Sequence, residues 1–167
     1  ELDKIPYDSK FIFEEIGYNF LPTEISAAFG LVQLKKLKKF SEIRQENFDN
    51  LYSFFFNNKF LKVPKQLSQV KTSWLAFPLT ITSNAPFSRL ELVKYLETNN
   101  IQTRPIFTGN VLRQPAFKNI NYKNLENDFH VSNNIMKNSF LIGCNHGLTS
   151  KHIEKIKNIF TKFLKNF

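Results

Sequence analysis

The chain has 167 residues, of which 42% are hydrophobic and 22% are charged, so long disorder and collagen-like repeats are excluded. Its 19 phenylalanines supply enough large apolar side chains to build one core. Cys144 is the single cysteine, which excludes an intrachain disulfide and a cysteine cluster for a metal. No run approaches the roughly 18 apolar residues of a membrane span, and we expect no signal peptide in the residues that follow Glu1. We therefore expect one domain in a cytoplasmic protein.

The net charge of +9 would suit an acidic partner, such as nucleic acid, an anionic membrane or a phosphorylated substrate. The excess is nearly all lysine, and the KKLKK run at 35–39 is typical of a solvated helix face. No motif of a nucleic-acid-binding fold accompanies the charge. We expect neither a membrane nor a nucleic-acid partner, although a basic, non-enzymatic module that binds an acidic partner stays open as an alternative.

Residues 1–22 contain two prolines and five aromatic residues. We expect an ordered loop here, because so many rings are not usually left in solvent. Thr23 is a typical helix N-cap. The spacing of apolar residues after it predicts a long helix, or two helices in line, over 24–56.

The middle of the chain alternates strand and helix patterns. A strand is predicted over 73–82, where Pro78 indicates a sheet edge or a bulge. Ser88 is placed to cap a helix over 89–98, and a second strand is predicted over 101–107.

After a polar loop, a short helix is predicted over 124–137 and a strand over 139–144. Thr149 then caps a final helix over 150–164. The apolar face of that helix is formed by Ile153, Ile156, Ile159, Phe160 and Phe163. The order of elements indicates an α+β fold, with a small, mainly antiparallel sheet covered by helices on one face.

Several kinds of catalytic site are missing from the sequence. There is no glycine-rich phosphate loop, no HExxH and no GxSxG. His130, His146 and His152 lack neighbours with metal-ligand spacing, so we expect no metal site. Cys144 and His146 could form a nucleophile pair, but no third group orients them, and a buried structural cysteine is favoured.

Two polar segments could recognise phosphate. The first is Gly17-Tyr18-Asn19, where glycine allows close backbone approach and the amide can donate to a phosphate oxygen. The second runs over 103–115 and carries Arg104, Asn110 and Arg113 around a glycine turn. Arginine suits the bidentate binding of phosphate oxygens.

A third polar segment, Asn145-His146-Gly147-Leu148-Thr149, forms a turn between a strand and a helix. Each of the three segments, taken alone, could also be an ordinary turn or carry a surface ion pair. Their order along the chain is more specific than any one of them.

The segment GYNFLPTEISAAFGLVQLKKLKKFSEIRQENF resembles the DegT/StrS-type family of vitamin-B6-dependent nucleotide-sugar aminotransferases and dehydrases. In that family a GYN motif precedes a T-E/D-I/M-x-A-A-x-G-L-x-Q-L helix that ends in R-x-x-N. The matching residues are Thr23, Glu24, Ala27, Ala28, Gly30, Leu31, Gln33, Leu34, Arg44 and Asn47. The later segments SWLAFPLTI, NIQTRPIFTGNVLRQPAF and IMKNSFLIGCNHGLT resemble the branch that removes the C3 hydroxyl from 4-keto-6-deoxy sugars.

This resemblance implies the C-terminal small domain of a fold-type I enzyme that uses pyridoxal phosphate. Residues 1–22 would be an interface and active-site loop, and 23–167 the small domain, with the large cofactor domain absent. That absent domain carries the Schiff-base lysine, or the histidine that replaces it in dehydrases. It also carries the cysteines of any iron–sulfur cluster. No catalytic residue is therefore expected in this chain, which should be inactive alone.

The resemblance also assigns roles to individual residues. Asn19 would reach the cofactor phosphate of the neighbouring subunit in a homodimer, with Tyr18 beside it. The residues implied to contact the nucleotide-diphosphate sugar are Arg104, Asn110, Arg113 and His146.

The implied reaction joins pyridoxamine phosphate to the C4 ketone of the sugar and expels the C3 hydroxyl, with the cofactor as electron sink. Transamination by a lysine-containing relative is the alternative within the family, and the residue that separates the two lies outside the sequence. We expect the dehydrase, acting in deoxysugar and lipopolysaccharide biosynthesis. A reductase partner stays open.

Overall fold

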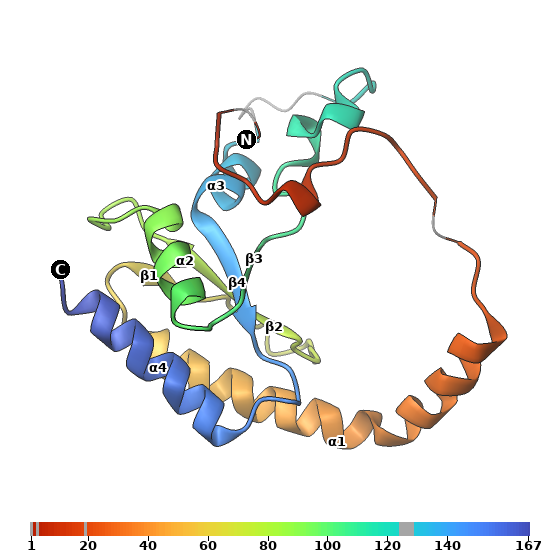
Figure 1. Ribbon diagram of the computed structural model, residues 1–167, viewed down its shortest axis with the longest axis horizontal. Coiled ribbons are helices and arrows are strands. Elements are labelled where there is room, and N and C mark those ends of the chain that lie inside the picture. The colour runs from red at the N-terminus through yellow and green to blue at the C-terminus, as the bar shows by residue number, and fades with distance from the viewer. Residues whose placement is uncertain (1, 3, 19, 124–128) are drawn as a thin grey trace.

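The computed structural model describes residues 2, 4–18, 20–123 and 129–167. The helices are α1 (Glu24–Phe55), α2 (Arg89–Thr98), α3 (His130–Asn138) and α4 (Ser150–Leu164), and the strands are β1 (Leu61–Lys62), β2 (Ala76–Ile81), β3 (Thr103–Pro105) and β4 (Ser139–Gly143). Short 3-10 helices span Ser9–Phe11, Val111–Arg113 and Pro115–Phe117. The strands form one antiparallel sheet in the order β1-β2-β4-β3 (Figure 1).

The sheet buries one face. Alternate residues of β2, Phe77 and Leu79 among them, are buried, and their partners on β4 are Ile142 and Phe140. These side chains share one core with the buried residues of α1, α2 and α4. The predicted α+β architecture, with a small antiparallel sheet under helices on one face, is therefore confirmed.

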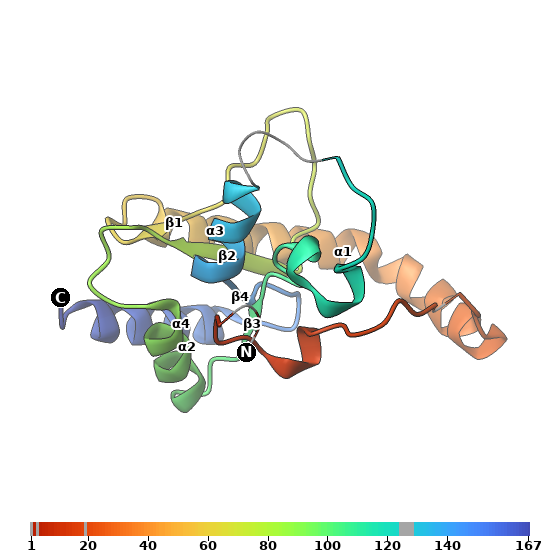
Figure 2. The ribbon, with the colours of Figure 1, turned by 90° about the horizontal axis from the view of Figure 1, so that it is seen from above.

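Helix α1 is one continuous helix, which confirms the prediction over 24–56 to within a residue. Thr23 caps it, because its Oγ1 accepts a hydrogen bond of 3.3 Å from the Ser26 amide. Only the second half of α1 contributes to the core, through residues such as Leu51 and Phe55, which are 0% exposed. The first half projects away from the sheet (Figures 1 and 2).

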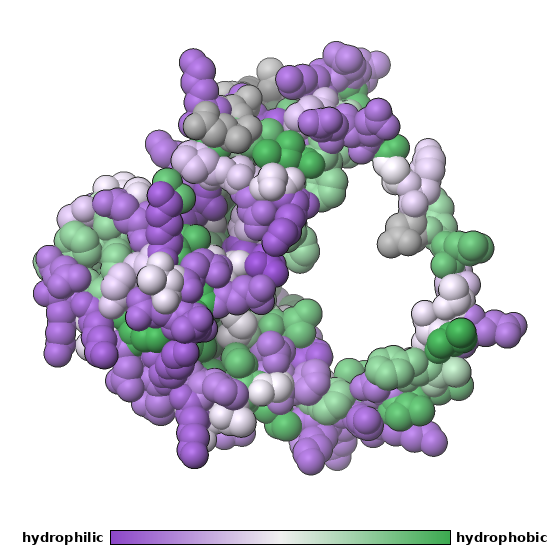
Figure 3. Space-filling view, in the orientation of Figure 1, coloured by the Kyte–Doolittle hydropathy of each residue, from purple (hydrophilic) through white to green (hydrophobic). Residues whose placement is uncertain are grey.

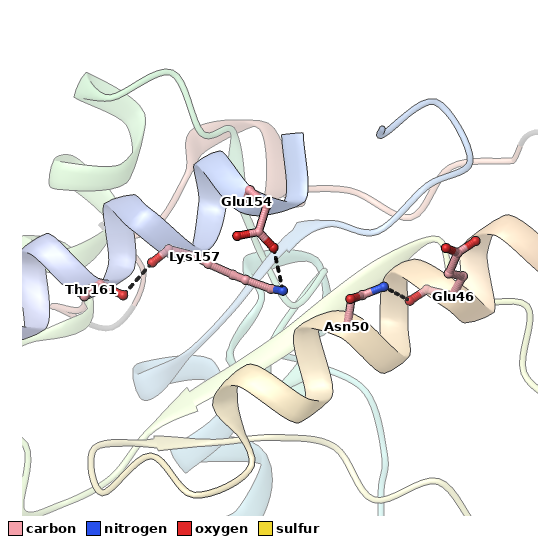
Figure 4. A network of polar contacts seen from close by, with 5 residues as sticks. All are labelled: Glu46, Asn50, Glu154, Lys157 and Thr161. Atoms are coloured by element: carbon pink, nitrogen blue, oxygen red, sulfur yellow. Dashed lines mark hydrogen bonds and ion pairs between the residues drawn. The ribbon is translucent and has the colours of Figure 1, made fainter. Parts of the chain in front are cut away.

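Helices α1 and α4 run side by side under the sheet. Each of the two helices also has polar contacts between its own residues (Figure 4). Lys157 forms an ion pair of 2.8 Å with Glu154 on α4, while Asn50 donates to the Glu46 carbonyl on α1. These contacts stay within one helix, so the apolar core has to hold the two helices together.

The caps of α2 and α4 follow from their sequences. Ser88 and Glu91 form a capping box, as Ser88 was expected to begin this helix. Thr149 begins α4, and His152 closes a similar box by accepting from the Thr149 amide at 3.1 Å. The exposed His152 therefore caps a helix. The bounds of both helices agree with the predictions over 89–98 and 150–164.

The strands differ more from the predictions. Strand β2 is shorter than 73–82, β3 is shorter than 101–107, and β1 was not predicted. Beyond β3, Phe107 takes a left-handed φ of 45°, which an extended strand cannot accommodate. Pro78 pairs with β4 alone, because β1 reaches only residues 80 and 81. Of the two predicted settings, an edge or a bulge, Pro78 thus occupies a local edge within an interior strand.

The helix predicted over 124–137 is observed from His130, and residues 124–128 lie outside the described part of the chain. Helix α3 leads directly into β4 without an intervening loop.

Residues 1–22 fulfil the expectation of an ordered, packed loop only in part. Phe11 is half-buried, but Tyr18 is 82% and Phe20 is 81% exposed. The segment that carries these two rings spans open space on its way to α1 (Figures 1 and 2). The expectation of packed rings was wrong for this segment, because both rings stay exposed in the described chain.

Candidate functional site

The GYN segment lies on the exposed stretch before α1. The Tyr18 ring makes a tilted contact with Phe20, whose centroid is 5.3 Å away. A Cβ added at Gly17 would meet no atom of the described residues within 4 Å, so packing against them does not require a glycine there. Asn19, the expected cofactor ligand, lies outside the described residues. The described part of the segment is open to a ligand or partner from outside the chain.

Apolar side chains continue along this stretch and the first half of α1. Leu21 is 91%, Ile25 is 85% and Phe29 is 65% exposed. The space-filling view shows apolar residues along this projection (Figure 3). We call residues 20–37 the arm. An apolar surface of this extent is typical of a face that is covered in an assembly.

Arg104 lies at the centre of the sheet's outer strand β3, opposite Leu141. Its guanidinium donates to the Thr103 carbonyl at 3.0 Å, and Thr103 Oγ1 donates in turn to Glu97 at 2.8 Å. A cleft of about 400 Å³ opens beside these groups. Arg89 and Lys10 also line this cleft, so positive side chains outnumber the carboxylates around it.

Asn110 and Arg113 meet through one shared partner. The Asn110 amide donates to Asn133 Oδ1 at 2.8 Å, and Arg113 Nε approaches the same oxygen at 3.2 Å. Asn110 is only 5% exposed, and its own Oδ1 accepts from the Leu112 amide. The side chain of Asn110 thus orders this turn and supports Arg113 through Asn133.

Gly109 sits immediately before Asn110, with a φ of 66°. A Cβ here would lie 2.5 Å from Met136 Cγ and 3.0 Å from the Tyr7 hydroxyl. Both the backbone conformation and the packing therefore require glycine at this turn.

His146 lies beyond the opposite end of β4 from this turn. Its ring stacks on Phe40, with centroids 3.7 Å apart, and its Nδ1 lies 3.2 Å from Arg44 Nη2. Because a guanidinium can only donate, Nδ1 accepts and the proton resides on Nε2. The structure therefore groups Asn110 with Arg113. It places His146 in a different cluster, in contact with Phe40 and Arg44 of α1.

The R-x-x-N residues of α1 form the contact with this second cluster. Asn47 is buried and donates to the carbonyls of Asn145 and Leu148 at 3.0 and 3.4 Å. Arg44 bridges His146 and the Ser73 hydroxyl. In the sequence these two residues stood out only as part of the family motif. Arg44 and Asn47 lie four residues before the buried Phe48 and Leu51, on the same face of α1, and polar residues on such a face signal buried polar partners.

Gln114 is a further residue that sequence reasoning missed. It is 0% exposed, although it is a polar residue in a loop. The signal in the sequence was its position between Arg113 and Pro115, within a segment already singled out for its polar character.

Cys144 is buried, and its thiol lies 3.7 Å from the Arg44 carbonyl. Burial raises the pKa of Cys144 to about 12, and the charge of Asp49 adds to this effect. The thiolate needed for nucleophilic attack is therefore disfavoured near neutral pH. This confirms the structural interpretation of Cys144.

Arg89 and Tyr7 form a partly buried pair next to the cleft. Arg89 donates to the carbonyls of Pro6 at 2.7 Å and Lys137 at 2.9 Å, and its guanidinium lies over the Tyr7 ring. Burial lowers the pKa of Arg89 and raises the pKa of Tyr7. The pair holds the N-terminal segment on the body of the domain.

The described ranges of the chain contain no group of three or more His, Cys, Asp or Glu residues able to hold a metal ion. The same residues include no helix that is both long and apolar enough to cross a membrane.

A long helix that leads into a small antiparallel sheet, with an exposed polar and aromatic loop before it, defines the small domain of a fold-type I pyridoxal-phosphate enzyme. The sequence model of the DegT/DnrJ/EryC1/StrS aminotransferase family matches residues 3–161. The chain belongs to this family, which confirms the resemblance seen in its motifs.

The chain is also similar to individual proteins of this family. The chain is 35% identical over 166 residues to the lipopolysaccharide biosynthesis protein RfbH of Salmonella typhimurium, covering 98% of this chain and 38% of that protein. It is 32% identical over 158 residues to the dTDP-4-dehydro-2,6-dideoxy-D-glucose 3-dehydratase of Saccharopolyspora spinosa, covering 95% of this chain and 34% of that protein.

A solved structure is similar throughout the domain. It is the E. coli GDP-4-keto-6-deoxy-D-mannose-3-dehydratase with bound hydrated PLP. The TM-score is 0.76 at 29% identity, and the match covers 91% of this chain and 39% of that one. The chain thus spans less than two fifths of the length of these relatives.

Proposed function

We propose that this chain is the C-terminal part of an enzyme that uses pyridoxal or pyridoxamine phosphate to remove the C3 hydroxyl of a nucleotide-linked 4-keto-6-deoxy sugar. The observation that carries this proposal is the match over 95% of the chain to a sugar 3-dehydratase, joined to the similarity with a second 3-dehydratase that binds PLP. Lipopolysaccharide biosynthesis fits the name of a third relative.

The described residues fit a role in completing a cofactor site rather than enclosing one. Tyr18 is 82% exposed, and among the described residues its ring contacts that of Phe20, so its hydroxyl is open to a group outside this domain. We propose that Asn19 contacts the cofactor phosphate of the neighbouring subunit, and that Tyr18 lies beside it, near the cofactor or the substrate. The cofactor, when bound, supplies the electron sink for the loss of the C3 hydroxyl.

The exposed apolar residues of the arm indicate where a subunit interface would lie. We propose that residues 1–22 form the interface and active-site loop, that 23–167 form the small domain, and that the arm is covered in a homodimer. The exposure of Leu21, Ile25 and Phe29 supports this assignment, because apolar side chains gain free energy when they leave water.

Arg104 and Arg113 are proposed to bind the diphosphate of the sugar nucleotide. A guanidinium can donate two parallel hydrogen bonds to phosphate oxygens, which both neutralises and orients the group. Asn110 positions Arg113 through Asn133 in the described structure, so its own substrate contact remains a prediction. His146 presents Nε2–H as a donor for a sugar hydroxyl, although it lies in the cluster on α1.

Transamination is the second candidate, because the family that matches residues 3–161 is named for aminotransferases. The two activities use the same cofactor and differ in whether a lysine forms a Schiff base with it. An iron–sulfur cluster, a reductase partner and a cytoplasmic location stay predictions.

Absorption spectroscopy of the enzyme that contains this chain tests the proposal. Pyridoxal phosphate is added first, followed by an amino donor. Cofactor that binds without a protein Schiff base supports the dehydrase. A Schiff-base band that disappears with the amino donor supports the aminotransferase. Failure to bind the cofactor contradicts the family-based function and favours the basic module.

A further inference from the structure

The N-terminal residues 5–13, here called the strap, are fastened to the loop at 107–117. The Tyr7 hydroxyl donates to the Phe107 carbonyl at 2.7 Å, and the Ala116 amide donates to the Phe13 carbonyl at 3.0 Å. Figure 1 shows the strap passing beside this loop near the start of α3. Two segments about a hundred residues apart in the chain are therefore joined at both ends of the strap.

Gln114 is the centre of this junction. Its amide nitrogen donates to the Phe11 carbonyl at 3.1 Å and to the Thr108 carbonyl at 2.9 Å. Its amide oxygen accepts from the Phe13 amide at 3.0 Å. The side chain is 0% exposed, so water cannot replace these partners without local opening. Each polar atom of one side chain is thus used to join the strap to the loop.

The junction limits where both segments assigned to ligand binding can lie. Phe13 is the last strap residue held by Gln114, and only residues 14–17 separate it from Tyr18. At about 3.5 Å per extended residue, Tyr18 is confined to within roughly 18 Å of Phe13. On the other side, the same amide holds Thr108, which lies between Arg104 and Asn110.

We propose that Gln114 is a positioning residue that couples cofactor binding beside Tyr18 to sugar-nucleotide binding at the 103–113 turn. This inference rests on the proposed function. Ordering of the strap by one ligand favours the arrangement of the loop that the other ligand needs. The coupling is reciprocal, because it is a free energy shared by the two binding equilibria.

The variant Gln114→Glu tests the junction with little change of shape. The carboxylate can still accept from Phe13, but its second oxygen faces two carbonyl oxygens in place of a donor. Gln66→Glu is the matched control, because Gln66 also donates to one carbonyl, that of Val70, and accepts from the Trp74 indole, away from the strap. Tyr7→Phe is a milder second variant that removes only the bond to Phe107.

Hydrogen exchange in the enzyme that contains this chain provides the first measurement. Loss of two donor hydrogen bonds is expected to raise exchange in peptides covering 5–13 and 107–117 about tenfold or more in Gln114→Glu. Tyr7→Phe should give a smaller increase in the same peptides, and Gln66→Glu none. Unchanged exchange in Gln114→Glu would overturn the proposed junction, whatever reaction the enzyme performs.

The second measurement is the dissociation constant of pyridoxal phosphate, with and without GDP or dTDP. In the parent enzyme the nucleotide should change this dissociation constant. In Gln114→Glu the ratio of the constants measured with and without the nucleotide should move towards one. A loss of stability alone would not change that ratio in the folded fraction. If the cofactor binds but the ratio is the same in both proteins, the coupling role is wrong and the proposed function stands. If the parent enzyme binds no cofactor, the proposed function fails, and with it the coupling role.

Discussion

Asn47 offers a direct test of how α1 is joined to the turn at 145–149. We expect Asn47→Leu to destabilise the chain, because it keeps a buried side chain of similar size but removes both donors. The carbonyls of Asn145 and Leu148, now bonded at 3.0 and 3.4 Å, would lose their partner. Asn47 itself is 5% exposed, and both hydrogen bonds are partly buried.

The expected magnitude follows from those two contacts. A neutral hydrogen bond contributes about 1 kcal/mol net, and a carbonyl left buried without a partner costs about 1–3 kcal/mol. The 3.4 Å contact is the weaker of the two. The added apolar atoms of leucine recover part of the loss. We therefore expect the free energy of unfolding to fall by about 2–3 kcal/mol.

Urea unfolding, followed by far-ultraviolet circular dichroism, measures this change. The matched control is Asn50→Leu on the same helix, because Asn50 is exposed and donates only to the Glu46 carbonyl within α1 (Figure 4). The control should change stability by less than about 0.5 kcal/mol. A fall in Asn47→Leu no larger than that of the control would refute the reasoning that Asn47 holds the turn.

Two further predictions concern Cys144 and the arm. The pKa of Cys144 is raised from 9.0 to about 12 in the folded chain. The contribution of the protonated, buried thiol to stability is therefore fully present below pH 9.0, and it is lost as the pH rises towards 12. Between these pH values the free energy of unfolding should thus fall less steeply with pH in Cys144→Ala than in the wild-type chain, by up to about 1.4 kcal/mol per pH unit. Parallel curves for the two proteins would contradict this. Phe29→Asp, at a residue 65% exposed, should weaken self-association in sedimentation without lowering the unfolding midpoint, whereas a wild-type chain that stays monomeric at high concentration would exclude the interface.

The helices illustrate how much could be predicted from local sequence. Thr23, Ser88 and Thr149 were expected to begin α1, α2 and α4, and each does so. A cap satisfies backbone donors within its own first turn, so its effect is readable without knowledge of the rest of the fold. The apolar period of α4 likewise placed Ile153 and Phe160 in the core.

The strands and the first loop were less predictable. Strand β1 consists of only Leu61–Lys62, and it exists because it pairs with residues 80 and 81 of β2. The aromatic content of 1–22 suggested packing, yet Phe20 is 81% exposed. A hydrophobic side chain gains free energy when it is buried, but its hydrophobicity does not specify which surface will cover it.

The sequence by itself determined the family, the α+β class and the principal helices, because motifs, caps and apolar periods are local properties of the chain. Only the tertiary structure decided which polar segments meet. It joined Asn47 to the turn at 145–149, and Gln114 to the strap, while it separated His146 from Arg113. Such contacts bring together residues about a hundred positions apart, and they form only when the core has placed both segments in reach.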